Sequence, residues 1–190
     1  MAQEAQEARE LDGVSLPPAG KYELDESHTV IGFEARHILT KVRGRFNEYS
    51  GMIVVGDTPE TSSVHVEVKT ASLTTNFQQR DDHLRSADFF ESDEYPVMTF
   101  DSTAIRHTGG TGFEIDGDLT IKDVTKPITL TGEFLGWGTD PFEKTFIAAE
   151  AKASIDREDW DLTWNMAVET GGWLVSKKID IVIDIEAKLV

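Results

Sequence analysis

The chain has 190 residues, and its 18 Lys and Arg against 35 Asp and Glu give a formal net charge of −17 at pH 7. Because nucleic acids and anionic lipid surfaces are bound through concentrated positive charge, this excess of acid excludes both as main partners. The chain has no cysteine, which excludes disulfides, thiolate metal sites and cysteine nucleophiles. Its length suits the core of one ordinary domain.

Residues 1–19 are interpreted as an acidic, flexible N-terminal tail. The first ten residues, MAQEAQEARE, contain no apolar run, and a pair of prolines at 17–18 ends the segment. A secretory signal would need a basic start and roughly 7–15 apolar residues. The sequence contains no run of roughly 18 apolar residues, so no membrane-spanning helix is predicted. We therefore expect a cytoplasmic protein without a membrane span, folded over residues 20–190.

From residue 21 onward, apolar and polar residues alternate with a period of two. In the first such run, Ile31, Phe33 and Ala35 share one face, and the residues between them share the other. This alternation is typical of antiparallel strands with one buried face. Many short strands separated by Gly- and Pro-containing turns indicate an all-β barrel or sandwich. The later runs with this pattern are 64–68, 98–104, 113–121, 128–134, 147–155, 160–168 and 179–187.

The segment 76–90 departs from this pattern. Phe77, Leu84 and Ala87 recur at helical spacing. Asn76 is a suitable N-cap, and Gln79, three residues later, occupies the second position of a capping box. The segment predicts one short helix, closing one end of the barrel.

The interior of such a barrel decides its function, because roughly eight strands enclose a space that side chains just fill or that holds one small ligand. Ala149, Ala151 and Ala153 follow one another on the apolar face of the run 147–155. The volume they leave is filled either by bulky neighbours such as Trp160 and Trp164 or by a ligand. The residues alone leave open a ligand-binding barrel and a filled barrel that acts as a stress or interaction protein.

Few polar residues are candidates for chemistry. His37 shares the apolar parity of its strand, and Arg45 and Arg80 could hold an anionic headgroup or simply be solvated. Asp82 and His83 could serve an enzyme acting on a buried apolar substrate, although charges in the first turns of a helix commonly pair with each other. No two of the five histidines are three or four residues apart, so we expect no metal site.

Several blocks, in their order and spacing, carry a family resemblance over residues 20–190. They are YELDESHTV at 22–30, GRF at 44–46, RDDHLRSADFF at 80–90, YPVMTFDS at 95–102, GDLTI at 117–121 with VTKP at 124–127, and IDR at 155–157. With these blocks the chain resembles the YceI-like family of lipocalin-like, polyisoprenoid-binding proteins. The resemblance implies an eight-stranded antiparallel barrel with an elongated apolar interior. It also implies non-catalytic binding, storage or transport of a long-chain isoprenoid or similar amphiphile, with the polar end at a mouth.

Two positions depart from the family pattern. Asp123 stands where the family commonly has a glycine before VTKP, and Trp160-Asp161 replaces an aromatic-glycine pair that often follows the arginine of IDR. The second departure falls on a run that we expect to line the interior, so the ligand could differ from that of relatives.

The binding prediction names specific residues. We expect no cofactor, and we expect the ligand to be a polyprenyl, quinone or fatty acyl chain. An exposed strand edge could also pair two copies of the chain as a homodimer. His37, Arg45 and Arg80 are the candidates for the headgroup end. The candidates for the apolar wall are Phe33, Val66, Met98, Phe100, Leu119, Leu130, Ala149, Ala151, Trp164 and Ile181.

Overall fold

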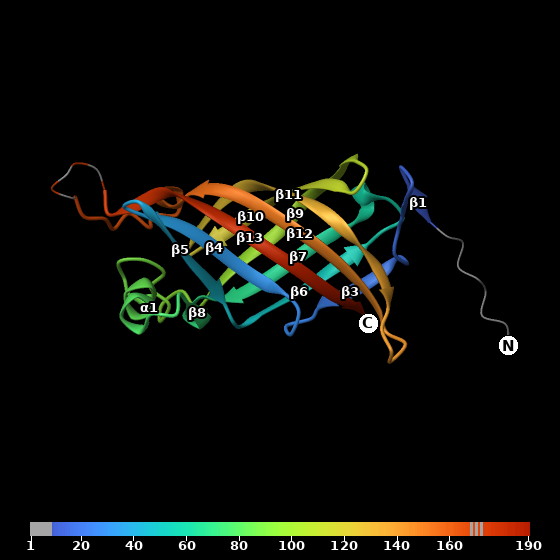
Figure 1. Cartoon of the computed structure of the whole chain (residues 1–190), viewed down its shortest axis with the longest axis horizontal. Helices are drawn as coiled ribbons and strands as arrows, with labels where there is room; N and C mark the ends of the chain where they lie inside the picture. The colour runs from blue at the N-terminus through green and yellow to red at the C-terminus, as the bar shows by residue number, and fades with distance from the viewer. Residues whose placement is uncertain (1–8, 168, 170, 172) are drawn as a thin grey trace.

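The computed structural model describes residues 9–167, 169, 171 and 173–190. These residues form an elongated, closed barrel of eight antiparallel strands with one short α-helix, which confirms the fold class expected from the sequence (Figure 1). Five strands follow one another as a meander, and the last pairs with the first strand of the barrel, β3 (Gly20–Leu24), to close it. They are β9 (Val97–Gly109), β10 (Gly112–Ile121), β11 (Val124–Thr139), β12 (Thr145–Asp156) and β13 (Val175–Leu189).

Each of the other three barrel strands is built from two shorter pieces. β3 and β4 (Val30–His37) both pair with β13, one after the other. β5 (Thr40–Phe46) and β6 (Tyr49–Val55) pair with β4 and β3, while β7 (Ser63–Lys69) and β8 (Leu73–Thr74) pair with β6 and β5. β7 also pairs with β9, which completes the ring. Short 3-10 turns at Pro59–Thr61 and Thr70–Ser72 flank β7.

The helix α1 (Gln78–Arg85) lies at one end of the barrel, within the segment where the sequence predicts a helix. Its cap differs from the prediction. Phe77 occupies the N-cap position without a side-chain cap bond, and Asn76 has a φ of 59°. The preceding turn is instead held by Asp81, which accepts a hydrogen bond of 2.8 Å from the backbone N–H of Thr75. A buried carboxylate inside the helix thus replaces the expected capping box.

The prediction of a strand at 160–168 is wrong. After β12 the chain enters a 3-10 turn at Arg157–Trp160, and Trp160 is buried with its Nε1 donating to the carbonyl of Leu119 at 3.0 Å. Asp161 then adopts a φ of 60°, a left-handed conformation that aspartate tolerates better than most residues. The departure at Trp160-Asp161 therefore lies on a turn and not on a strand lining the interior. Residue 168 lies outside the described residues.

The N-terminal segment also differs from its expectation as a flexible tail. Residues from 9 onward form a hairpin of β1 (Glu10–Leu11) and β2 (Val14–Ser15). Asp12 and Gly13 both have positive φ, as the tightest hairpin turns require. The hairpin lies at the end of the barrel opposite α1 (Figure 1). Residues 1–8 lie outside the described residues.

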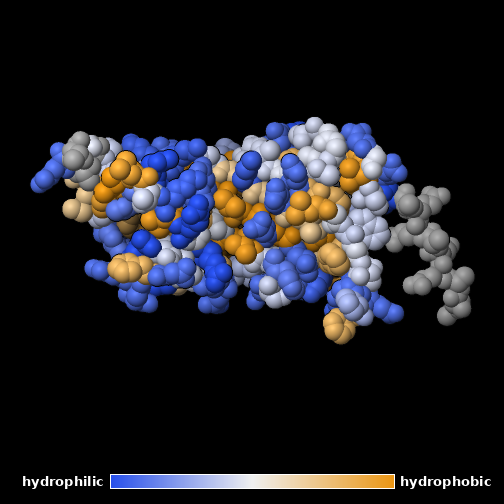
Figure 2. Space-filling model, in the orientation of Figure 1, coloured by the Kyte–Doolittle hydropathy of each residue, from blue (hydrophilic) through white to orange (hydrophobic). Residues whose placement is uncertain are grey.

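The outer face of the barrel carries mostly polar side chains, between which narrow apolar strips are visible (Figure 2). Outward residues of neighbouring strands form ion pairs, such as Lys41 with Glu34 at 2.5 Å and Arg106 with Glu114 at 3.1 Å. The described residues include no helix long and apolar enough to cross a membrane. Most of the apolar strand residues pack together on the inner face, as the alternation predicts.

Candidate functional site

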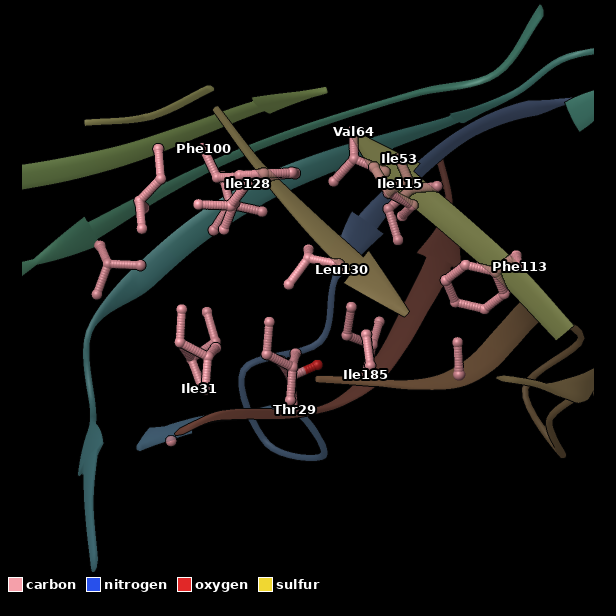
Figure 3. A pocket seen from close by; sticks show the side chains of 18 of the residues that line it. Thr29, Ile31, Ile53, Val64, Phe100, Phe113, Ile115, Ile128, Leu130 and Ile185 are labelled. Carbon is pink, nitrogen blue, oxygen red and sulfur yellow. The ribbon is translucent and has the colours of Figure 1, made fainter. Parts of the chain in front are cut away.

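The barrel encloses an apolar cavity with a volume of about 370 Å³. It extends from Leu11 and Pro17 of the N-terminal segment to Leu162 beside α1, and strands from all sides contribute to its wall. Figure 3 shows side chains such as Ile31, Leu130 and Ile185 turned toward one common space. This volume lies within the range of ordinary small-molecule sites, which is about 300–1,000 Å³.

The structure brings together nine of the ten predicted wall residues. Trp164 is the exception, because the strand that would have turned it inward does not form. Its ring instead packs edge-on against His83, with 4.5 Å between ring centroids, and at 5.4 Å from Phe89. The residues that do line the cavity are Phe33, Val66, Met98, Phe100, Leu119, Leu130, Ala149, Ala151 and Ile181.

Glycines opposite aromatic residues help to keep the interior open. Gly44 lies directly across from Phe33, and a Cβ on Gly44 would stand 2.6 Å from Cε1 of that ring. The same arrangement recurs where the ring of Phe113 covers Gly132, its partner across the ladder. Because these rings lie against bare backbone, they occupy the wall rather than the middle of the barrel. Sequence alternation finds such residues but does not show the direction of the ring.

None of the three headgroup candidates lines the cavity. Arg45 is exposed on β5, and His37 lies at the end of β4 outside the cavity wall. Arg80 is turned back onto the chain before α1, where its Nε donates to Thr75 Oγ1 at 2.6 Å. Its guanidinium also lies over the ring of Phe77, 5.5 Å from the centroid. Arg80 thus serves the local structure around α1, and the cavity wall includes none of the three side chains that the sequence predicts at the headgroup end.

Asp82 and His83 do not form an acid–base pair on the cavity. Asp82 accepts from Gln78 Nε2 at 2.7 Å and pairs with Arg85 at 3.2 Å. His83 instead bonds Asp88 through Nε2 at 2.8 Å. Neither residue lines the cavity.

At the hairpin end, the cavity wall contains His107. Its Nε2 lies 2.9 Å from the carbonyl oxygen of Gly110, and its Nδ1 lies 3.7 Å from a carboxylate oxygen of Asp12. The hairpin contributes Leu11 and Val14 to the wall. The apolar residues of the hairpin thus cover the end of the cavity, with the turn residue Asp12 near His107.

Polar bonds fix the hairpin to the barrel. Arg9 donates to the carbonyl oxygens of Gly56 at 2.5 Å and Asp57 at 2.8 Å. Trp137 Nε1 donates to Ser15 Oγ at 3.1 Å. These bonds are at least partly exposed to solvent, so each contributes little to stability.

Arg157 is the one charged side chain among the described residues of the wall, and the sequence analysis did not single it out. It is 4% exposed, at the α1 end. Its Nε donates to the carbonyl oxygen of Ser176 at 3.0 Å, and its Nη1 donates to that of Leu162. Burial lowers the pKa of the guanidinium. It follows a strand end, where alternation says nothing about side-chain direction, so only the block IDR pointed to it.

Among the described residues, one group has the donor atoms for a cation: Asp25, His28 and Glu186. Lys188 Nζ already lies 2.6 Å from Asp25 Oδ2 and supplies the positive charge. Hydrogen bonds from Lys188, Ser27 and His28 hold the pKa of Asp25 far below its usual value. The cluster therefore caps the turn between β3 and β4.

Comparison with known proteins places this barrel in a family. A model of the YceI-like domain matches residues 22–187. Protein YceI of Escherichia coli O17:K52:H18 is 32% identical over 172 residues, or 88% of this chain and 86% of that protein. A crystallised YceI protein of Campylobacter jejuni is 31% identical, with a TM-score of 0.71, and the match covers 88% of this chain and 96% of that one.

A polyisoprenoid binding domain from Saccharophagus degradans shares the fold, with a TM-score of 0.66 at 13% identity over 91% of this chain and all of that one. The family model spans nearly the whole barrel, from the buried Tyr22 of β3 to Ala187 of β13. The hairpin of residues 9–17 lies outside that match. From its sequence and its architecture, the chain belongs to the YceI-like domain family.

Proposed function

We propose that the protein binds a long-chain isoprenoid or a similar amphiphile non-covalently inside the barrel, and stores or carries it without catalysis. The observation that carries this proposal is the continuous apolar cavity along the barrel, with Arg157 and His107 as its only titratable wall residues among those described. The fold shared with the polyisoprenoid binding domain of Saccharophagus degradans supports the same class of ligand.

Burial of the chain supplies the affinity. Each methylene removed from water contributes about 0.8 kcal/mol, which changes the dissociation constant about fourfold. Ten buried methylenes would contribute about 8 kcal/mol before the costs of association are subtracted. Such a site binds chains by length and shape and needs few polar contacts.

Two alternatives have less support. A filled barrel acting as a stress or interaction protein requires an interior plugged by tryptophans, whereas Trp160 is buried beside the barrel wall and Trp164 does not line the cavity. An enzyme built on Asp82 and His83 requires these groups on the cavity, and both lie outside it. The homodimer and the cytoplasmic location stay predictions, to be measured by light scattering and by cell fractionation.

The first test combines identification of the cargo with a chain-length series. Native mass spectrometry of protein purified from its host, followed by organic extraction, should release a stoichiometric prenyl or acyl compound. Calorimetry with alkyl and prenyl chains of increasing length should show about a fourfold gain in affinity per added methylene, up to the length that fills the cavity. A protein without cargo that takes up no added chain would exclude the carrier function.

A matched pair of variants tests the place of binding. Ala149 lines the cavity, whereas the adjacent Ala148 does not. Ala149→Phe should shorten the longest chain that still gains affinity, because the new ring occupies cavity volume. Ala148→Phe adds the same ring on the opposite face of β12 and should leave the chain-length profile unchanged. Equal effects of the two variants would place binding elsewhere on the protein.

A further inference from the structure

Arg157 has an incomplete set of hydrogen bonds. Its Nε and Nη1 donate to backbone carbonyls, whereas its buried Nη2 has no hydrogen-bond partner among the described residues. The only other buried side-chain atom without a partner among them is Ser92 Oγ, which does not belong to the cavity wall. Leaving a buried donor unpaired is destabilising, and more so when the group is charged.

The charge of Arg157 is only partly compensated, because Asp156 and Glu158 act on it from a distance without forming an ion pair. The two neighbouring carboxylates are used elsewhere, because Asp156 accepts the backbone N–H of Glu158, and Glu158 lies 2.6 Å from Lys177 Nζ. No ion pair joins Arg157 to a carboxylate in the described part of the chain. Buried charges in proteins are ordinarily paired, since removing one from water is costly.

The surroundings of the guanidinium belong to the cavity. Its Cζ lies 5.9 Å from the centroid of the Phe89 ring, and Nη1 is bonded to Leu162. Phe89, Leu162 and Arg157 itself line the same end of the cavity. An apolar chain in the barrel would therefore bring its terminal group close to a buried cation. Because Nη2 itself is fully buried, the guanidinium must turn toward the cavity for this donor to meet the ligand.

We propose that Arg157 binds an anionic oxygen of the ligand, a carboxylate or a phosphate at the end of the apolar chain. This inference rests on the proposed function and fixes the orientation of the ligand. The acid end lies deep, next to α1, and the tail points toward the N-terminal hairpin. A charge-assisted bond from arginine to such an oxygen is among the strong hydrogen bonds of proteins.

The test compares three prenyl compounds of one chain length: the carboxylic acid, the monophosphate and the neutral alcohol. We expect at least one of the two anions to bind the wild-type protein at least tenfold more tightly than the alcohol, and the preferred anion identifies the headgroup. In Arg157→Gln this preference should disappear while the affinity for the alcohol changes less than threefold. Arg80→Gln removes a cation outside the cavity and should keep the preference.

A measurement on the wild-type protein tests the pairing of Arg157 with the acid group of the ligand even if Arg157→Gln does not fold. Carbon-13 NMR follows the ionisation of a carboxyl-labelled acid in the cavity as pH changes. A partner cation lowers the pKa of the bound acid below that of the free acid, whereas burial without a partner raises it. A raised pKa, or binding of both anions no tighter than that of the alcohol, overturns the inference and leaves the proposed function standing. Failure of all three compounds to bind counts against both.

Discussion

The contact between Phe33 and Gly44 provides a direct test of how the cavity is kept open. A Cβ on Gly44 would lie 2.6 Å from Cε1 and 2.9 Å from Cε2 of the Phe33 ring, closer than real Cβ contacts. In Gly44→Ala the ring must therefore move. Overpacking of this kind typically costs about 1–3 kcal/mol. Replacing a glycine within a strand by alanine offsets about 0.5–1 kcal/mol of this cost, so the net destabilisation should be about 0–2.5 kcal/mol.

A double-mutant cycle isolates this contact. In a Phe33→Leu background the ring atoms that meet the new Cβ are gone, and Gly44→Ala should then stabilise the protein by about 0.5–1 kcal/mol. The interaction energy between the two substitutions should be about 1–3 kcal/mol, in the range of residues in contact. Urea unfolding of the four proteins measures it.

Gly32→Ala serves as the control on the adjacent strand. Its Cβ would meet backbone oxygens of Gly44 and Val182 at 3.3 and 3.4 Å, which requires shifts of only tenths of an ångström. We expect a change within about 0.5 kcal/mol in either background. Equal destabilisation by Gly44→Ala with and without the Phe33 ring would refute the reasoning, because strain in the backbone would then be the cause.

Three further predictions concern other parts of the molecule. Leu73 is fully buried but does not line the cavity, so Leu73→Ala should cost about 2–5 kcal/mol in urea unfolding and leave the ligand affinity of the folded protein unchanged. Hydrogen bonds from Arg106 and Thr129 lower the pKa of Asp116 to about 2, so its stabilisation is complete above about pH 4 and is lost as pH falls toward 2. Asp116→Asn should flatten that part of the pH profile of unfolding. Deletion of residues 1–17 removes the cover at one end of the cavity, and stopped-flow uptake of a fluorescent fatty acid should become at least tenfold faster; an unchanged rate would show that ligands enter elsewhere.

The sequence predicts the barrel well because one physical pattern determines it. Alternation with a period of two assigns each side chain to a face, and closure of the sheet turns that face into the interior. Ala149 and Ala151 line the cavity for this reason. The pattern fails for Trp164, because the chain leaves the sheet after Asp156, at the end of β12, and Asp161 adopts a left-handed conformation. A period read from side chains does not reveal where the backbone stops being extended.

The polar part of the site is less predictable, for a different reason. The sequence identifies His37, Arg45 and Arg80 as polar residues near the expected ends of the barrel, but it does not show which partner a polar side chain will turn toward. Arg80 thus bonds Thr75, only five residues away in sequence. Arg157 lies just beyond a strand end, and its burial depends on carbonyls supplied by Leu162 and Ser176. Those partners come together only in the folded chain.

The two ends of the cavity differ in how they are closed, and this difference suits a carrier. The end beside α1 is closed by chain that belongs to the core, with Trp160 and Leu162 buried there. The other end is covered by a short hairpin joined to the barrel by hydrogen bonds of Arg9 and Ser15. Opening the first end would disrupt the core. Opening the second end requires only that a few partly exposed hydrogen bonds break, each contributing about 0.5–1.5 kcal/mol, and that the hairpin's apolar residues separate from the cavity wall. Ligand exchange should therefore proceed at the hairpin end, with the tail leading outward and the acid end leaving Arg157 last.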